Sequence, residues 1–341
     1  MTQENSFDRL RRVSSAFQEP SVLAAAAELD VFTEILKHEN RRTAAEIAET
    51  LEAEERGVTV LLDALAAAEY LKKEAEVYSV AEAFRELLDS RHPATFVPMI
   101  RHMACCQRSW ANLARTVKDG VPAPRPCSIL GPEEDYKSFL LAMHSIGRVL
   151  VAETVESLKA AGVLPLAKKN ARFLDIGGAS GTYTQAFLEA IPGSEGTIFD
   201  LPAGILAAKE RFTGTEFAGR VMLVAGDFYR DEFPTGYDFA WISAIIHQHG
   251  LAETRELFRK TFRALNPGGM VAVRDFVMEE SRTEPRDGAF FGVNMLSNTK
   301  NGMVYTFGEI KESLEAAGFG EVRLAVPVRS MSAVVTAEKS F

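Results

Sequence analysis

The chain has 341 residues, of which 47% are apolar and 25% charged, so it is long enough for two domains of ordinary globular composition. Its formal charge of −9 argues against a nucleic-acid partner, because phosphate binding requires a basic face. Three cysteines form no disulfide framework and suit a reducing cytoplasm, and we see neither a signal peptide nor an uncharged apolar run of about 18 residues that would indicate a membrane partner.

The first hundred residues predict a helical domain. Apolar residues recur at helical spacing in residues 20–36, and Thr43 with Glu46 forms a capping-box pattern at the start of the next helix. A third helix is predicted over residues 56–71, and two short β-rich segments in residues 72–80 suit a hairpin. Three helices followed by a hairpin are typical of a winged helix.

The predicted winged helix is acidic. Residues 41–91 contain 12 Asp and Glu but only 7 Lys and Arg, which gives a net charge of −5. A domain with this balance repels phosphate, so we expect a dimerisation platform rather than DNA binding.

The next segment predicts two long helices separated by a proline-rich loop. These helices are expected to connect the two domains and to line a substrate cleft, and the adjacent cysteines Cys105 and Cys106 are interpreted as packing residues. The predicted organisation is therefore a winged-helix-like domain in residues 1–100, connecting helices in residues 101–165 and a catalytic domain in residues 166–341.

From residue 171 onwards, short β-rich runs alternate with helical stretches. This alternation predicts an α/β fold with a mostly parallel sheet and helices on both faces. The last two runs lack a long helix between them, so we expect an antiparallel hairpin there. The predicted strands are residues 172–178, 196–202, 221–228, 237–243, 270–276, 322–327 and 331–338.

Three successive predicted strands carry an aspartate near their carboxyl ends: Asp175, Asp200 and Asp227. In an open α/β sheet, ligands bind beyond the carboxyl ends of the strands, where the strand order reverses. An acid at position 200 suits two ribose hydroxyls, and Asp227 followed by Phe228 suits an adenine ring. These residues predict a site for a nucleotide-like ligand.

The glycine-rich turn Gly177-Gly178-Ala179-Ser180-Gly181 does not fit a dinucleotide fingerprint. The pattern G-x-G-x-x-G that begins at Gly177 requires glycine at positions 179 and 182, where the chain has alanine and threonine. We therefore favour another ligand over NAD, and the remaining alternative is that these glycines only form tight turns.

Several longer stretches resemble one family. The segments "FLDIGGASG", "FDLP", "AGDFYRDEFPTGYD", "IIHQHG" and "LNPGGMVAVRDFV" are similar to class I S-adenosylmethionine-dependent O-methyltransferases with an N-terminal winged-helix dimerisation domain. This family includes plant caffeate-type and bacterial antibiotic-tailoring enzymes, and the resemblance covers nearly the whole chain. It implies a Rossmann-like seven-stranded catalytic domain, a homodimer and S-adenosyl-L-methionine as cofactor.

The resemblance also implies roles for individual residues. The glycine turn is expected to face the methionine moiety of the cofactor, Asp200 to hold its ribose, and His247 to act as the general base. The implied cofactor-binding residues are Asp175, Gly177, Gly178, Gly181, Asp200, Leu201, Gly226, Asp227, Phe228 and Ser243. The implied substrate-binding residues are Trp110, Met143, His144, Asn294 and Met295, and no metal is implied.

The neighbours of His247 depart from the family pattern. Gln248 stands where the family has an aspartate, Asn294 stands at a usually acidic position, and the segment "KNGMVYT" replaces a motif with a glutamate that orients the histidine. We therefore expect either that His247 lacks a carboxylate partner and is a weak base, or that another residue orients it. His249 is expected either to assist or to be exposed to solvent.

The predicted function is O-methylation of a hydroxylated, aromatic small molecule. A phenol has a pKa of about 10, so a histidine with a pKa of about 6.5 must accept its proton as the new bond forms. The departure around His247 leaves two alternatives open: C-methylation or a non-methylating reaction at the same cofactor site, and a non-catalytic ligand-binding regulator.

Overall fold

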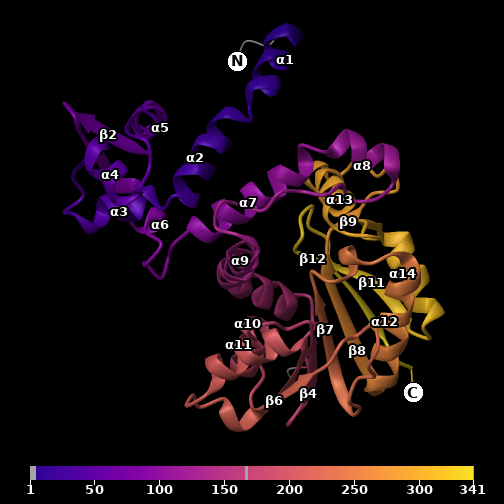
Figure 1. Cartoon of the computed structure of the whole chain (residues 1–341). Helices are drawn as coiled ribbons and strands as arrows, with labels where there is room; N and C mark the ends of the chain where they lie inside the picture. The colour runs from indigo at the N-terminus through magenta and orange to yellow at the C-terminus, as the bar shows by residue number, and fades with distance from the viewer. Residues whose placement is uncertain (1–4, 166–167, 341) are drawn as a thin grey trace. The chain divides into compact units, whose positions relative to one another are not determined.

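The computed structural model describes residues 5–165 and 168–340, which form two compact units (Figure 1). The first unit comprises residues 1–111 and 124–145, and the second comprises residues 112–123 and 146–341. The predicted connecting segment, residues 101–165, is thus divided between both units. The boundaries at residues 100 and 165 therefore stay predictions.

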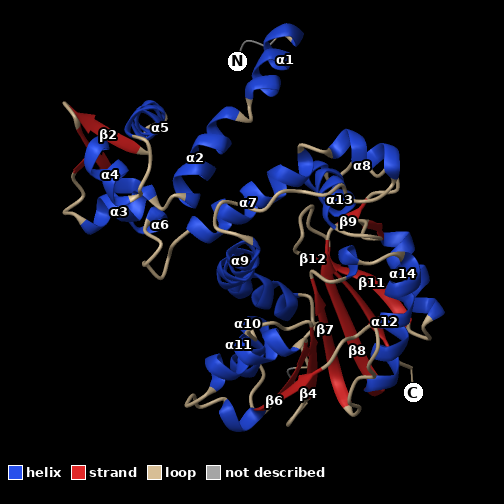
Figure 2. Cartoon of the chain, in the orientation of Figure 1, coloured by secondary structure: helices blue, strands red, loops and turns tan. Residues whose placement is uncertain are grey.

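The first unit is mainly helical and contains one small antiparallel sheet in the order β1-β3-β2 (Figure 2). Its buried side chains form one apolar cluster that includes Phe32, Ile47, Leu62 and Tyr78. Its elements are α1 (Ser6–Ser15), α2 (Gln18–Glu28), α3 (Val31–Lys37), β1 (Arg42–Thr43), α4 (Ala44–Thr50), α5 (Glu55–Ala67), β2 (Leu71–Glu74), β3 (Val77–Val80), α6 (Arg85–Leu88) and α7 (Val97–Trp110).

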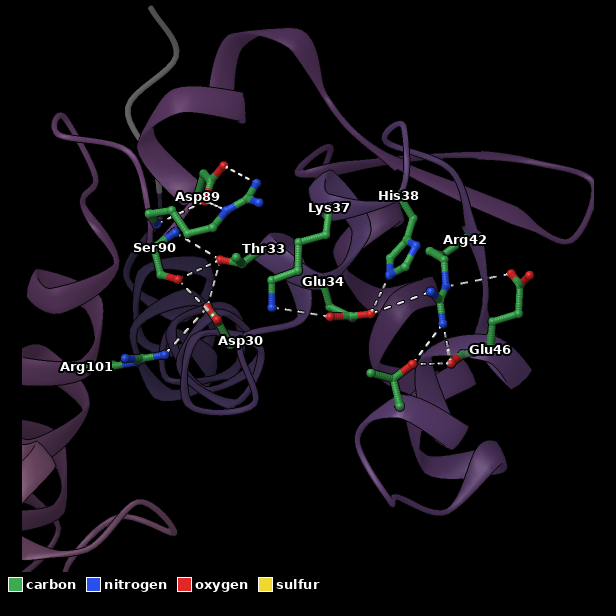
Figure 3. A network of polar contacts seen from close by, with 12 residues as sticks. Asp30, Thr33, Glu34, Lys37, His38, Arg42, Glu46, Asp89, Ser90 and Arg101 are labelled. Carbon is green, nitrogen blue, oxygen red and sulfur yellow. Dashed lines mark hydrogen bonds and ion pairs between the residues drawn. The ribbon is translucent and has the colours of Figure 1, made fainter.

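The helix predicted over residues 20–36 is interrupted. Asp30 adopts a left-handed backbone conformation with a φ of 56°, and the chain continues as α3 after it. The Asp30 side chain is held by the hydroxyls of Thr33 and Ser90, at 2.8 and 3.1 Å, and lies 3.6 Å from the Arg101 guanidinium (Figure 3). These polar contacts divide one predicted helix into two. By contrast, the predicted capping box of Thr43 and Glu46 is confirmed.

A second polar cluster of the first unit engages basic side chains (Figure 3). The buried carboxylate of Glu34 lies 3.5 Å from Lys37, 3.1 Å from His38 and 3.5 Å from Arg42. The Arg42 guanidinium also donates to the carbonyl oxygen of Glu46, at 2.6 Å. Lys37, His38 and Arg42 thus share one carboxylate inside the first unit.

Two further helices carry the chain towards the catalytic sheet. α8 (Leu113–Asp119) belongs to the second unit, and α9 (Pro132–Ala160) contributes residues to both units. By length and composition alone, α9 could cross a membrane, since an 18-residue window has a mean hydropathy of 1.3. A single helix of this kind is weak support for a membrane, because helices of soluble proteins meet the same criterion.

The second unit contains a seven-stranded sheet in the order β11-β12-β8-β7-β4-β5-β6 (Figure 2). The five strands from β8 to β6 are parallel, and β12 is antiparallel to both β8 and β11. The predicted α/β fold and terminal hairpin are confirmed. The strands are β4 (Arg172–Ile176), β5 (Glu195–Asp200), β6 (Val221–Ala225), β7 (Tyr237–Ser243), β8 (Leu265–Asp275), β11 (Gly320–Val326) and β12 (Ala333–Glu338).

Helices cover both faces of this sheet. Successive residues of β7 enter different apolar clusters, Trp241 on one face and Ile242 on the other, because side chains alternate along a strand. The first cluster contains side chains of α9, α10 and α11, and the second contains side chains of α12 and α14. The helices of this unit after α9 are α10 (Thr182–Ala190), α11 (Pro202–Phe212), α12 (Leu251–Ala264), α13 (Arg286–Asn298) and α14 (Phe307–Ala316), and a two-stranded parallel sheet pairs β9 (Val277–Met278) with β10 (Tyr305–Thr306).

The strand order reverses between β4 and β7. The chain proceeds from β4 through β5 to β6 in one direction, and from β7 to β8 in the other. The carboxyl ends of β4 and β7 therefore flank the crevice in which a ligand of such a sheet binds.

Candidate active site

A strained turn follows β4. Gly177 and Gly181 have φ angles of 70° and 76°, and Ala179 between them has a φ of 47°. The Gly177 amide donates to the carbonyl oxygen of Phe199 at 2.8 Å, and a Cβ atom at position 177 would lie 2.5 Å from Ile245. Only glycine fits there, so the chain can turn tightly against Ile245 directly after β4.

Asp175 supports this turn from below. Its carboxylate accepts a hydrogen bond of 2.6 Å from Thr184 in α10, and a Cβ atom at Gly178 would lie 2.7 Å from its carboxyl carbon. Burial raises the pKa of Asp175 to about 7, the Thr184 hydrogen bond opposes that rise, and the charge of Asp200 adds to it. Asp175 therefore lies beneath the turn, and its role as a cofactor ligand stays a prediction.

Asp200 ends β5 beside the same turn. Its two carboxylate oxygens accept hydrogen bonds of 2.7 Å from the amides of Ala179 and Leu201. Burial raises its pKa, and these two hydrogen bonds oppose the rise. Each carboxylate oxygen retains a further lone pair, so Asp200 can accept from two hydroxyl groups of a ligand. The adjacent Leu201 side chain is exposed.

The turn after β6 holds the third predicted group. The Gly226 amide donates to the Asp200 carbonyl oxygen at 2.9 Å, and a Cβ atom there would lie 2.3 Å from the Phe199 ring. Asp227 accepts from the Tyr229 amide at 2.9 Å, so its carboxylate starts a tight turn. The half-buried Phe228 follows it.

A buried lysine that the sequence analysis missed fixes this turn. Lys260 in α12 donates to the carbonyl oxygens of Phe228 and Asp231, at 2.9 and 2.8 Å. The turn also borders a pocket of about 330 Å³, which is lined by Phe228, Tyr229, His249, Ala252, Glu253, Glu256 and Leu257. The turn is therefore anchored from the helix that follows β7, a contact that no local pattern indicates.

His247 has a carboxylate partner. It lies in a short 3-10 helix (Ile246–Gln248) after β7, is 7% exposed, and its Nδ1 lies 2.9 Å from both carboxylate oxygens of Asp275. Because an ionised carboxylate only accepts, Nδ1 is the nitrogen that donates in this contact, and in the neutral imidazole Nε2 is then the acceptor. The expectation that His247 lacks such a partner is wrong, and the alternative that another residue orients it is confirmed.

Asp275 was missed because it lies on a different strand. It ends β8, the parallel neighbour of β7, and also accepts from the Phe276 amide at 2.8 Å. The ring of Phe291 in α13 packs edge-on against the His247 ring, with 4.8 Å between the ring centres. The rule that selected three strand-end aspartates would also have selected this fourth one.

His249 differs from His247 in its surroundings. It is 2% exposed, so the expected exposure to solvent is wrong. Its Nδ1 forms a short hydrogen bond with the Tyr229 hydroxyl, and its Nε2 is buried without a partner in the described part of the chain. Burial lowers the pKa of His249 to about 4, with the charge of Glu253 opposing, so the ring is neutral near pH 7.

The remaining predicted residues fall into three groups. Ser243 ends β7 and accepts a hydrogen bond of 3.1 Å from Arg274. Asn294 and Met295 lie in α13, the helix that also carries Phe291. The third group of predicted substrate residues, Trp110, Met143 and His144, belongs to the first unit, so their part in the site stays a prediction.

Two known protein families match most of the sequence. An O-methyltransferase domain matches residues 132–320, and an O-methyltransferase dimerisation domain matches residues 12–90. The chain belongs to the O-methyltransferase family. The family uses S-adenosylmethionine, so the chain is an S-adenosylmethionine-dependent O-methyltransferase of small molecules.

Relatives match along nearly their full length. The chain is 30% identical to the tetracenomycin polyketide synthesis 8-O-methyl transferase TcmO of Streptomyces glaucescens, over 92% of this chain and 91% of the relative. It is 25% identical to the acetylserotonin O-methyltransferase of Homo sapiens, over 93% and 94% of the two chains.

Solved structures share the fold. The human N-acetylserotonin methyltransferase in complex with SAM aligns with a TM-score of 0.80 at 22% identity, over 100% of this chain and 99% of that one. PigF with SAH aligns with a TM-score of 0.83 at 22% identity, over 98% and 100%.

The residues of the crevice fit the cofactor. S-adenosylmethionine supplies an electrophilic methyl group on a positively charged sulfur when it is bound. The two free acceptor sites on Asp200 suit the ribose, and the turn of residues 177–181 carries no bulky side chain that would keep the methionine moiety from its backbone. The half-buried Phe228 suits a flat base.

Proposed function

We propose that this enzyme methylates a hydroxyl group on an aromatic small molecule, with His247 as the general base. The hydrogen bond between His247 Nδ1 and Asp275, 2.9 Å long, carries the proposal. It fixes the tautomer, so that Nε2 accepts the proton of the acceptor hydroxyl while the new oxygen–carbon bond forms. Asp275 stabilises the resulting imidazolium and thereby acts as a positioning residue.

The aromatic acceptor is proposed from two observations. Phe291 presents its ring to His247, and an aromatic wall beside the base suits a flat acceptor. The names of three relatives describe O-methylation of a tetracenomycin polyketide, of acetylserotonin and of 3-hydroxy-5-methyl-1-naphthoate.

The alternative functions, a different reaction at the same site or a non-catalytic regulator, are less well supported than O-methylation. C-methylation and a non-methylating reaction were favoured by a histidine without partners, and His247 has Asp275. A DNA-binding regulator is disfavoured by the acidic balance of residues 41–91, which contain 12 Asp and Glu but only 7 Lys and Arg.

The proposed enzyme is a homodimer in the cytoplasm. The matched dimerisation domain supports the dimer, and helix α1 leaves large apolar side chains exposed. These side chains are Phe7, Leu10 and Val13, and Phe17, just before α2, is exposed as well. Light scattering of the full chain tests the assembly, and a mass of one chain at micromolar concentration would contradict it.

The acceptor class is tested with methyl-labelled S-adenosylmethionine and a panel of phenols, thiols and carbon acids. The proposal expects label on the oxygen of phenols, identified by mass spectrometry of the products. Label only on carbon or sulfur, or no transfer to any phenol, would overturn it.

A further inference from the structure

A buried arginine without a carboxylate partner lies beside Ser243. Arg274 in β8 is 4% exposed; its Nη1 donates to Ser243 Oγ at 3.1 Å and its Nη2 to Ser332 Oγ at 3.4 Å. The guanidinium carbon lies 5.7 Å from the centre of the Tyr183 ring. Two neutral hydroxyls and an aromatic face are weak partners for a buried charge.

Most of the donors of Arg274 remain unused. A guanidinium has five N–H groups, and the hydrogen bonds to the two serines use two of them. Its Nε is buried without a hydrogen-bond partner, and none of the carboxylates in residues 5–165 and 168–340 forms an ion pair with it. Because a buried charge without a counterion is unfavourable, this arrangement points to an anion that the chain itself does not supply.

Arg274 lies at the crevice. It pairs with Ser243 in the register of β7 and β8, at the carboxyl end of both strands. Tyr183 belongs to the first turn of α10, the helix that follows the glycine turn. The guanidinium therefore occupies the α10 side of the strand ends, whereas Asp275, the next residue of β8, holds His247 on the other side.

The charges around the crevice explain why a cation is needed there. The carboxylates of Asp175, Asp200, Asp227 and Asp275 lie at strand ends. They favour the sulfonium and ammonium groups of S-adenosylmethionine and disfavour its carboxylate. A guanidinium at the end of β7 and β8 provides the complementary charge and a bidentate geometry that suits a carboxylate.

We propose that Arg274 binds a carboxylate in the crevice, supplied by the amino-acid moiety of S-adenosylmethionine. An acidic acceptor is the other source of the same chemistry, and the experiment separates the two. The inference rests on the cofactor use of the family and does not depend on His247 or on the nature of the acceptor.

The test compares S-adenosylmethionine with decarboxylated S-adenosylmethionine, which lacks only the carboxylate. Calorimetry without acceptor measures both dissociation constants for the wild type, Arg274→Met and Arg274→Lys. The wild type is expected to bind the intact cofactor about 10- to 100-fold more tightly, the Met variant to lose this ratio, and the Lys variant to keep part of it. A ratio within one protein is insensitive to a partly unfolded fraction.

Arg220→Met is the matched control. Arg220 is half-buried and donates to the carbonyl oxygens of Ser194 and Leu188, at the amino ends of the strands. This variant is expected to keep the wild-type ratio.

Four further outcomes are decisive. An unchanged ratio in Arg274→Met, together with lost selectivity for carboxylated over neutral acceptors, assigns the carboxylate to the acceptor. An unchanged ratio without such a loss overturns the inference, and so does a wild-type ratio near one without acceptor selectivity. A wild type that binds neither compound overturns the cofactor use itself, and the inference with it.

Discussion

The two sides of the crevice are built in different ways. The cofactor side, after β4 and β5, is held mostly by hydrogen bonds of backbone amides, both near in sequence, as from Leu201 to Asp200, and between neighbouring strand ends, as from Ala179 to Asp200. The base side, after β7 and β8, depends on a contact between His247 and Asp275, which are 28 residues apart. The first side therefore depends largely on backbone groups of its turns, whereas the second depends on one pair of side chains from neighbouring strands.

A comparison of the two histidines on the base side shows the effect of a carboxylate partner. His247 and His249 are both buried and lie two residues apart. One has a carboxylate on Nδ1, and the other has only the Tyr229 hydroxyl and a pKa lowered to about 4 by burial. Only the first is arranged to hold a proton during catalysis.

The largest effect is expected from removing the base. We predict that His247→Gln lowers kcat about 10²- to 10⁴-fold, because the acceptor proton then has no positioned base. Calorimetry should show unchanged affinity for S-adenosylhomocysteine, since the cofactor side is intact. His249→Gln is the matched control, and an equal loss of kcat in that variant would remove the distinction between the two histidines.

The next effect is expected from the positioning residue. We predict that Asp275→Asn lowers kcat about 10²-fold, because an amide can donate to Nδ1 and favour the wrong tautomer. The proton of Nδ1 then moves to Nε2, which no longer accepts. Nitrogen chemical shifts of His247 report the tautomer, and a wild-type tautomer with reduced kcat would refute this explanation.

A substitution on the cofactor side is expected to lower the stability of the fold. Gly177→Ala places a methyl group against Ile245 in a left-handed conformation, and we predict a loss of about 2–4 kcal/mol in the free energy of unfolding. Gly214→Ala is the control, because Gly214 has a φ of 77° but open space around it. Equal losses in urea denaturation of both variants would show that the Ile245 contact contributes nothing.

The smallest effect is expected from Asp175, which lies beneath the glycine turn, and it concerns the dependence of stability on pH. Burial raises the pKa of Asp175 to about 7, above its unfolded value, so its ionisation lowers stability as the pH rises from about 4 to 7. We predict that Asp175→Asn removes this loss. The variant should gain about 1 kcal/mol or more over the wild type at pH 8 relative to pH 4, since each pKa unit corresponds to about 1.4 kcal/mol. A constant difference across this pH range would contradict the raised pKa.

Much of the cofactor side could be predicted from the sequence. The alternation of strands and helices predicted the sheet, and the strand-end residues Asp175, Asp200 and Asp227 predicted the position of the crevice. These features are local, because turn geometry and hydrogen bonds between close residues leave a pattern of glycines and acids in the chain.

The base side could be predicted only in part. The position of His247 follows from the resemblance, but its partner Asp275 depends on which strand lies beside β7. Lys260 and Arg274 were missed for the same reason, since each contacts residues that are close only after the sheet and its helices have formed. The sequence does contain one indication of this kind, because a charged residue such as Arg274 in an otherwise apolar strand is unusual and suggests a specific role.

The most direct test of His247 as the base asks whether the loss of activity in His247→Gln depends on the acidity of the acceptor. The wild type and His247→Gln are compared on a series of phenols of similar shape, from acceptors that are protonated at the assay pH to nitrophenols that are already ionised. We predict a loss of about 100-fold or more for protonated acceptors and nearly none for ionised ones, because an ionised acceptor needs no base. The same loss across the whole series would contradict a role for His247 in proton transfer.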